Sequence, residues 1–213
     1  MDFVSAVGTI RRPVTLAAVG LCAVACSGGG SGSTPAAPPA STAPPGATAS
    51  TTPAATETPP PGDIPDTTVY VAYRPASGQY RVKVPEGWAR TVSPAGVSFT
   101  DKLNTITIRT VRAAAPAVAS ARSTEVPQIQ GSAHGFSLIG ISTVSRPAGT
   151  VVLIRYSADS QPDPVTGKVF RDTVERYEFY RNGTEAVVIL AGPAGADNVD
   201  PWRTVTASFR WLR

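Results

Sequence analysis

A proline-rich tract limits where this chain can fold. Residues 27–63 read SGGGSGSTPAAPPASTAPPGATASTTPAATETPPPGD and contain nine of the 21 prolines, no aromatic residue and two charged residues, Glu57 and Asp63. So little apolar surface cannot offset the entropy that is lost when a backbone is ordered. We therefore expect residues 26–63 to form a disordered, partly polyproline-II linker, followed by one folded domain.

Residues 64–213 have the size and composition of a single domain. These 150 residues hold all three tryptophans and all six tyrosines, and a chain of this length buries roughly two-thirds of its unfolded surface. They carry 17 Lys and Arg against 12 Asp and Glu, a net charge of +5 without a block of like charge. Because a basic stripe with interleaved aromatic residues is missing, we expect no nucleic-acid partner.

Residues 1–25 have the pattern of a secretory signal peptide. Arg11 and Arg12 precede 13 uncharged residues, 13–25, which is shorter than the roughly 20 apolar residues that a membrane-spanning helix needs. The paired arginines leave Tat export open, although Ile10 and Thr15 fit a Tat signal poorly and favour the Sec route.

The end of this segment, AVAC at residues 23–26, resembles the lipobox of bacterial lipoproteins. That resemblance implies cleavage before Cys26 and an N-palmitoyl, S-diacylglycerol modification of this cysteine. Cys22 follows bulky Leu21 and fits such a cleavage site less well. A Cys22–Cys26 disulfide, a metal site and a redox pair are less favoured alternatives, because the chain has one histidine and three residues separate the cysteines. We expect a protein that two acyl chains anchor on the extracytoplasmic face of the cell membrane.

Alternating and turn patterns predict the elements of the domain. In residues 105–111, Ile106 and Ile108 alternate with Thr105, Thr107 and Arg109, which is typical of a half-buried strand. Further strands are predicted at residues 67–75, 79–88, 96–101, 136–145 and 150–159, and in the hairpin 174–190.

The turns and helices follow from other signals. Asn182-Gly183 indicates a type I′ turn inside the hairpin. A helix is predicted over residues 113–126, followed by loops around Pro127 and Gly131, and a second over residues 198–212 with Asp200 as its N-cap. The expected fold is α+β, an antiparallel sheet of about six to seven strands flanked by helices.

The order of several segments resembles one family. YRVKVPEGW, GVSFTD, NTITIRTV, a helix, YRNGTEAVVIL and WRTVTASFRW follow one another as in the LpqN-type lipoproteins of mycobacteria and their relatives. These share their fold with the PsbP proteins of photosynthetic membranes and with a Ran-binding nuclear import factor. The resemblance covers most of residues 68–213 and implies a non-catalytic PsbP-like domain that binds proteins or envelope components.

Residues for catalysis or metal binding are sparse. The mature domain has no cysteine nucleophile, its one histidine, His134, lies in the flexible segment GSAHGFS, and the common catalytic and nucleotide-binding motifs are missing. Asp159 and Asp163 lack the ligand spacing of a calcium loop and indicate a polar hairpin loop instead. We predict no catalytic, cofactor or metal site; an enzyme would need a cleft around Asp159, Asp172 or His134.

Charged and aromatic residues provide candidate contacts for a partner. The acidic residues Asp172, Glu175 and Glu178 alternate with Arg171, Arg176 and Arg181, which indicates a solvated strand face or, alternatively, a charged partner-binding face. Among the tryptophans, Trp88 and Trp202 are expected to pack in the core, and Trp211 is expected to be exposed. The candidate partner-binding residues are Arg171, Arg176, Arg181 and Trp211.

Two functions are consistent with these features. The first is a lipid-anchored domain that binds a protein partner in cell-envelope assembly or transport. The second is a carrier that holds a lipid or glycan in a cavity between sheet and helix. An apolar pocket of several hundred Å³ with a few inward polar groups would favour the carrier, and a filled core would favour the protein-binding domain.

Overall fold

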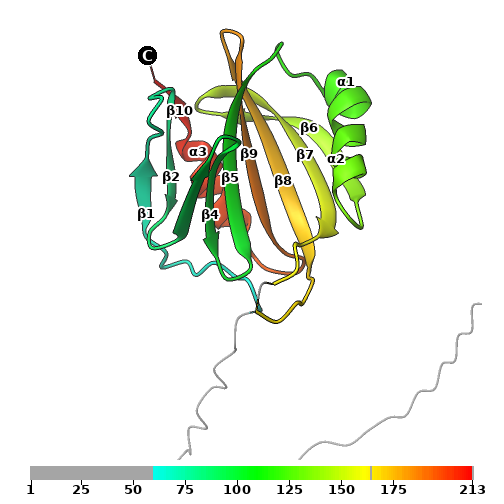
Figure 1. Cartoon of the computed structure of the whole chain (residues 1–213). Coiled ribbons are helices and arrows are strands. Elements are labelled where there is room, and N and C mark those ends of the chain that lie inside the picture. Colours follow the sequence, from blue (N-terminus) through cyan, green and yellow to red (C-terminus); the bar gives the residue numbers. More distant parts are fainter. Residues whose placement is uncertain (1–59, 164, 213) are drawn as a thin grey trace, which may run out of the picture. The chain divides into compact units, whose positions relative to one another are not determined.

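The computed structural model describes residues 60–163 and 165–212 (Figure 1). The predictions on the signal peptide, Cys22 and Cys26, and nearly all of the predicted linker, lie outside these residues. Within them, no helix has the length and apolar character that crossing a membrane requires.

A seven-stranded antiparallel sheet forms the centre of the domain, in the order β3-β4-β5-β9-β8-β7-β6. Its strands are β3 (Ala89–Ser93), β4 (Gly96–Asp101), β5 (Asn104–Arg112), β6 (Ser137–Arg146), β7 (Gly149–Asp159), β8 (Arg171–Arg181) and β9 (Thr184–Pro193). The predicted hairpin joins β8 to β9 through Asn182 and Gly183, whose φ angles of 48° and 77° are those of a type I′ turn. The α+β fold and the antiparallel sheet are therefore confirmed.

Strand β3 was not predicted from the sequence. All five of its residues are exposed, and it lies at an edge of the sheet. A strand without a buried face has no alternation of apolar and polar residues for sequence analysis to detect.

The C-terminus differs from the predicted helix. Helix α3 covers Val199–Ser208, begins after Asn198 rather than Asp200, and ends at Phe209, which has extended backbone angles. Arg210–Trp211 then forms strand β10 and pairs with β2. Strands β1 (Tyr70–Tyr73), β2 (Tyr80–Pro85) and β10 make a second, three-stranded sheet. The sequence extended the helix through Phe209 because this apolar side chain falls at helical spacing. Phe209 is fully buried, but its backbone is extended.

The first helical segment also has other bounds than predicted. It consists of α1 (Val118–Ser120), the π-helical turn η1 (Ala121–Glu125) and α2 (Val126–Ser132). The helix thus starts five residues later than expected and continues past Pro127. Proline has no N–H to donate within a helix, and the preceding turn is widened, since the N–H of Val126 donates to the carbonyl of Ala121.

Different elements cover the two faces of the large sheet (Figure 1). On one face, α3 and β2 pack against β4, β5, β7, β8 and β9 around fully buried residues such as Phe179 and Phe209. On the other face, α1, η1 and α2 lie beside β6 and β7, and Ala121 and Val126 contact a smaller cluster that includes Ile154. Buried side chains fill the space between the sheet and α3, whereas the smaller cluster beneath η1 and α2 covers only part of the opposite face of the sheet.

Two buried asparagines bind the segment that precedes β1. Asn104 and Asn198 each donate from Nδ2 to the carbonyl of Gly62, at 2.7 and 3.1 Å, and Asn198 Oδ1 accepts from the N–H of Ile64 at 2.9 Å. Gly62 and Ile64, at the expected boundary between linker and domain, are therefore held against β5 and the start of α3.

Candidate functional site

A groove lies between α2 and the part of the sheet that the helix leaves uncovered. It consists of two pockets of about 420 Å³ each, which share Ser132, Ala133, Tyr156 and Ile189 as lining residues. Thr105 lines one pocket and Thr107 the other, so the polar face of β5 forms a wall along the whole groove. Polar and charged side chains line both pockets beside apolar ones.

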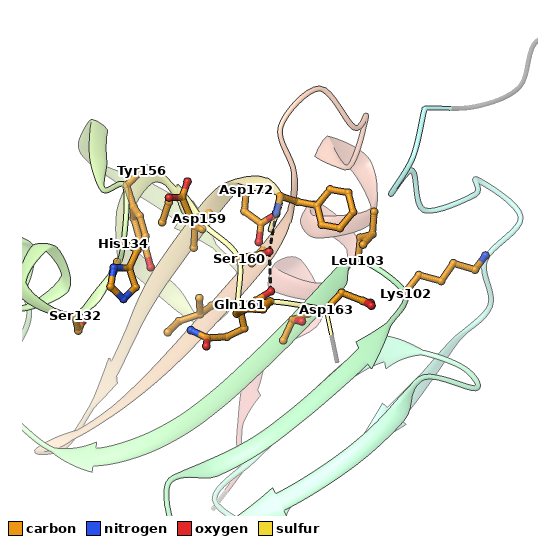
Figure 2. Close-up of a pocket in the computed structure, with 18 residues that line it drawn as sticks. Lys102, Leu103, Ser132, His134, Tyr156, Asp159, Ser160, Gln161, Asp163 and Asp172 are labelled. Atoms are coloured by element: carbon orange, nitrogen blue, oxygen red, sulfur yellow. Dashed lines mark hydrogen bonds between the residues drawn. The ribbon is translucent and has the colours of Figure 1, made fainter. Parts of the chain in front are cut away.

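Asp172, at the start of β8, lies at one end of the groove (Figure 2). The residue is 8% exposed, and its Oδ1 is buried without a hydrogen-bond partner in the described part of the chain. Burial, and secondarily the charge of Asp159, raises the pKa of Asp172 to about 6. Burial of this carboxyl was not expected, because the sequence placed Asp172 on a solvated strand face.

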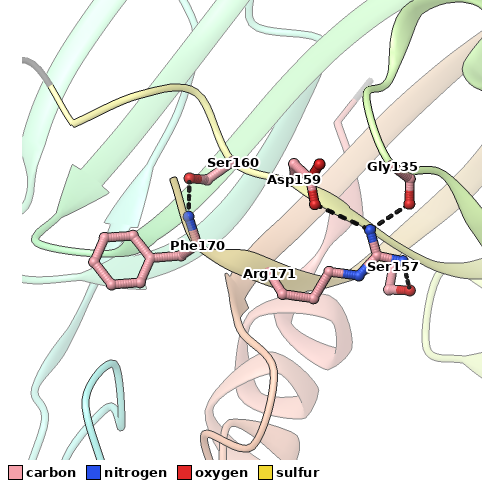
Figure 3. Close-up of polar contacts among 6 residues, drawn as sticks. All are labelled: Gly135, Ser157, Asp159, Ser160, Phe170 and Arg171. Atoms are coloured by element: carbon pink, nitrogen blue, oxygen red, sulfur yellow. Dashed lines mark hydrogen bonds and ion pairs between the residues drawn. The ribbon is translucent and has the colours of Figure 1, made fainter. Parts of the chain in front are cut away.

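Arg171 connects the loops around this end of the groove rather than facing solvent freely (Figure 3). Its guanidinium donates to the carbonyl of Gly135, to Asp159 Oδ1 at 3.1 Å and to Ser157 Oγ at 2.7 Å. The N–H of Asp159 in turn donates to the carbonyl of His134 at 2.9 Å. Arg171 therefore joins the segment after α2 to the end of β7.

The β7–β8 loop closes the same end of the groove. Asp163 Oδ1 accepts from the N–H groups of Thr166 and Val165, at 2.7 and 3.1 Å, and these bonds hold its pKa below the ordinary value. The N–H of Phe170 donates to Ser160 Oγ at 3.0 Å across the loop. The prediction of a polar hairpin loop around Asp163 is confirmed.

The other end of the groove contains a partly buried charged cluster. Arg176, 7% exposed, donates from Nε to Glu178 Oε1 at 2.8 Å, and Glu178 is 1% exposed. Burial raises the pKa values of Glu178 and Glu185. Oxygens of Glu125, Glu178 and Glu185 are buried without partners among the described residues. The prediction that Glu178 and Arg176 lie on a solvated face is thus wrong, because the helix covers that face of β8.

Arg181 and Trp211 lie elsewhere, beside the β8–β9 turn. They line a pocket of about 290 Å³, and Arg181 Nη1 donates to the carbonyl of Leu212 at 3.4 Å. Trp211 is half-buried and packs edge-on against Phe209, with ring centroids 5.3 Å apart, so it is not the exposed tryptophan that the sequence predicted. Trp202 is buried in the core as expected, whereas Trp88, like Trp211, is partly buried and packs against the core.

The four candidate partner-binding residues therefore do not form one surface. Arg171 belongs to the loop contacts, Arg176 to the buried cluster, and only Arg181 and Trp211 share a pocket. Alternation along β8 could not separate them, because sequence alone does not show which strand face a distant helix covers.

His134, Asp159 and Asp172 line one pocket, which is the arrangement that an enzyme would need (Figure 2). Asp159, however, is paired with Arg171 rather than with His134. Residues 60–163 and 165–212 also contain no group of three or more His, Cys, Asp or Glu that could hold a metal ion. The pocket therefore offers a free buried carboxyl but no hydrogen-bonded acid–base pair formed by these three side chains.

Comparisons with known proteins give similarity to solved structures alone. No protein-family model and no curated protein matches the chain. Cyanobacterial PsbP (CyanoP) of Synechocystis sp. PCC 6803 has a TM-score of 0.48 at 15% identity, over 72% of this chain and 99% of that chain. The Ran-binding protein Mog1p of Saccharomyces cerevisiae has a TM-score of 0.47 at 10% identity, over 68% and 96%.

LpqN of Mycobacterium tuberculosis, which is involved in cell envelope biogenesis, has a TM-score of 0.41 at 13% identity, over 70% of this chain and 93% of that chain. None of these similarities assigns a function to a residue of this chain. Membership of the LpqN-type family stays a prediction.

Proposed function

We propose that this chain is a lipid-anchored extracytoplasmic protein whose domain binds an extended segment of a protein partner in cell-envelope assembly or transport. The groove beside α2 is the proposed binding site. The observation that carries the proposal is its shape and lining: two adjacent open pockets that share four lining residues, with charged and polar groups distributed along both.

This lining favours a peptide over an acyl chain. A carrier for a lipid tail needs an enclosed apolar cavity, whereas Asp172, Arg176 and Glu125 all line this groove. On the opposite face, the core between the sheet and α3 is filled by aromatic and aliphatic side chains. A peptide segment can pair its own polar groups with those of the groove, and an acyl chain cannot.

Site-specific photocrosslinking in intact cells tests the proposed binding site. A photoreactive residue replaces Gln128, an exposed residue of α2 that lines the groove, or Thr204, an exposed residue of α3 on the other side of the sheet. We expect adducts to one envelope protein from position 128 and not from position 204. Equal capture at both positions, or adducts to lipid or glycan alone, would contradict the proposal; the second result would favour the carrier.

The anchor is tested separately, since it is inferred from the sequence alone. Cys26→Ser is expected to release the protein from membranes and to abolish incorporation of radiolabelled fatty acid, while Cys22→Ser changes neither. Cell fractionation and autoradiography measure both effects. Retention of the Cys26→Ser variant in the membrane would contradict lipidation at this cysteine.

A further inference from the structure

We propose that the Asp172 end of the groove binds the ammonium group of a lysine side chain that the partner segment supplies. This inference rests on the proposed function and names the chemical group that the groove recognises.

Asp172 is a buried carboxyl without a partner among the described residues. Its Oδ1 has no hydrogen bond, and none of the ion pairs among the described residues includes it. The neighbouring carboxylates are already engaged, Asp159 by Arg171 and Asp163 by the backbone of Thr166. A buried carboxylate costs free energy unless a cation or a hydrogen-bond donor reaches it.

The nearby cations of the domain do not fill this position. Lys102 lines the same pocket, but Figure 2 shows its side chain extending away from Asp172. Arg171, the preceding residue in β8, directs its guanidinium to Gly135, Asp159 and Ser157 instead. None of the ion pairs among the described residues includes Asp172, so this position is open to a cation that a ligand supplies.

The walls of the pocket suit the stem of a lysine. Tyr156, Phe170, Val174, Ile189 and Ala191 line the pocket together with Asp172. A lysine buries its four methylene groups along apolar surface while its charge reaches a polar site. The two aromatic rings add favourable contacts for a methylene stem and for a cation.

Ammonium fits this site better than guanidinium or a metal ion. Arginine recognises a carboxylate with two parallel hydrogen bonds and needs both oxygens accessible, whereas Asp172 Oδ1 is buried. A metal ion would need several ligands, and the described residues offer no such group here. A single ammonium is a compact charge that can approach the Asp172 carboxylate from the pocket that this residue lines.

NMR titration of the full chain carrying Cys26→Ser tests this inference. The probe is N-acetyl-lysine methylamide, and N-acetyl-norleucine methylamide is the uncharged control with nearly the same stem. We expect saturable shifts of amides around Asp172 with the lysine probe and none with the norleucine probe. Asp172→Asn should weaken binding about tenfold or more, the range for a lost hydrogen bond to a charged group.

Asp101→Asn is the matched control variant. It removes the same charge from an exposed residue at the neighbouring β4–β5 turn, outside this pocket, and should leave the affinity for the probe unchanged. Equal affinity of the Asp172→Asn and unmodified proteins, equal binding of both probes, or no saturable shift at all would overturn the inference.

The outcome is distinguishable from a failure of the proposed function. If the lysine probe binds at Asp172 but crosslinking from position 128 captures no protein, the ammonium site stands and the protein-binding function fails. If a protein is captured but Asp172→Asn has no effect on the probe, the function stands and the ammonium site fails.

Discussion

Asp172 is the residue whose chemistry departs most from what its sequence context predicts. An aspartate between Arg171 and Thr173 in a strand of alternating charges is expected at the surface, yet it is 8% exposed and faces the groove. Such buried, unpaired carboxyls lower stability at neutral pH and are typical of binding sites.

This burial gives the domain a defined pH dependence. Because the pKa of Asp172 is raised from 3.8 to about 6, the folded state binds the proton more tightly than the unfolded state. The resulting stabilisation is complete below about pH 4 and is lost as the pH rises through 6. Asp172→Asn should therefore stabilise the domain, relative to the unmodified protein, by about 2 kcal/mol more at pH 7.5 than at pH 4.

Urea denaturation at the two pH values measures this difference. Asp101→Asn, at an exposed position, should show no comparable change between the two conditions. A stability difference for Asp172→Asn that stays constant with pH would show that this carboxyl is not buried in solution.

At the scale of elements, one glycine determines how the segment after α2 meets β7. Gly135 has a φ of +62°, and a Cβ placed there would lie 2.5 Å from Asp159 Oδ2 and 2.6 Å from Arg171 Nη1. A larger residue would have to break the contacts of Arg171 that join the two loops. This wall of the groove depends on a position without a side chain.

Gly135→Ala should accordingly destabilise the domain by about 1–3 kcal/mol and speed amide hydrogen exchange at the end of β7. Gly167→Ala is the matched control, because Gly167 has a φ of +69° and a Cβ added there would have no neighbouring atom within 4 Å. Both variants lose free energy of unfolding because alanine is strained at a positive φ, so the additional loss in Gly135→Ala measures the steric conflict at that position. Equal costs would contradict the packing described for this loop.

The elements that were predicted correctly are those with strong local signals. The alternation in β5, the apolar runs of β7 and β9 and the Asn182-Gly183 turn all predicted the observed structure. The misplaced helix ends and the missed strand β3 have weaker local signals, because a π turn, an extended Phe209 and an exposed edge depend on tertiary packing.

The candidate site was predictable only in part. The sequence singled out Asp159, Asp172 and His134 as residues around which a cleft would have to form, and all three line one pocket. It did not predict that the polar face of β5 would form the wall of a groove. The sequence placed Thr105 and Thr107 on a solvated strand face, and only the position of α2 makes that face the wall of a groove.

At the scale of the whole domain, the two faces of the large sheet differ, since one is filled and the other is partly open. Helix α3 and the small sheet complete the larger core, while α1, η1 and α2 cover part of the opposite face and leave the groove beside β5 and β9. The proposed lipid anchor would hold this domain at the membrane surface, and the groove would remain accessible to an envelope protein.

The affinity of the crosslinked partner segment for the full chain carrying Cys26→Ser tests the proposed groove most directly. Thr107→Trp places a large side chain in the groove, and Thr204→Trp places the same side chain on the exposed side of α3. With both variants shown to be folded, calorimetry should find binding weakened about tenfold or more by Thr107→Trp and unchanged by Thr204→Trp. Unaltered binding to the Thr107→Trp protein would contradict the groove as the partner site.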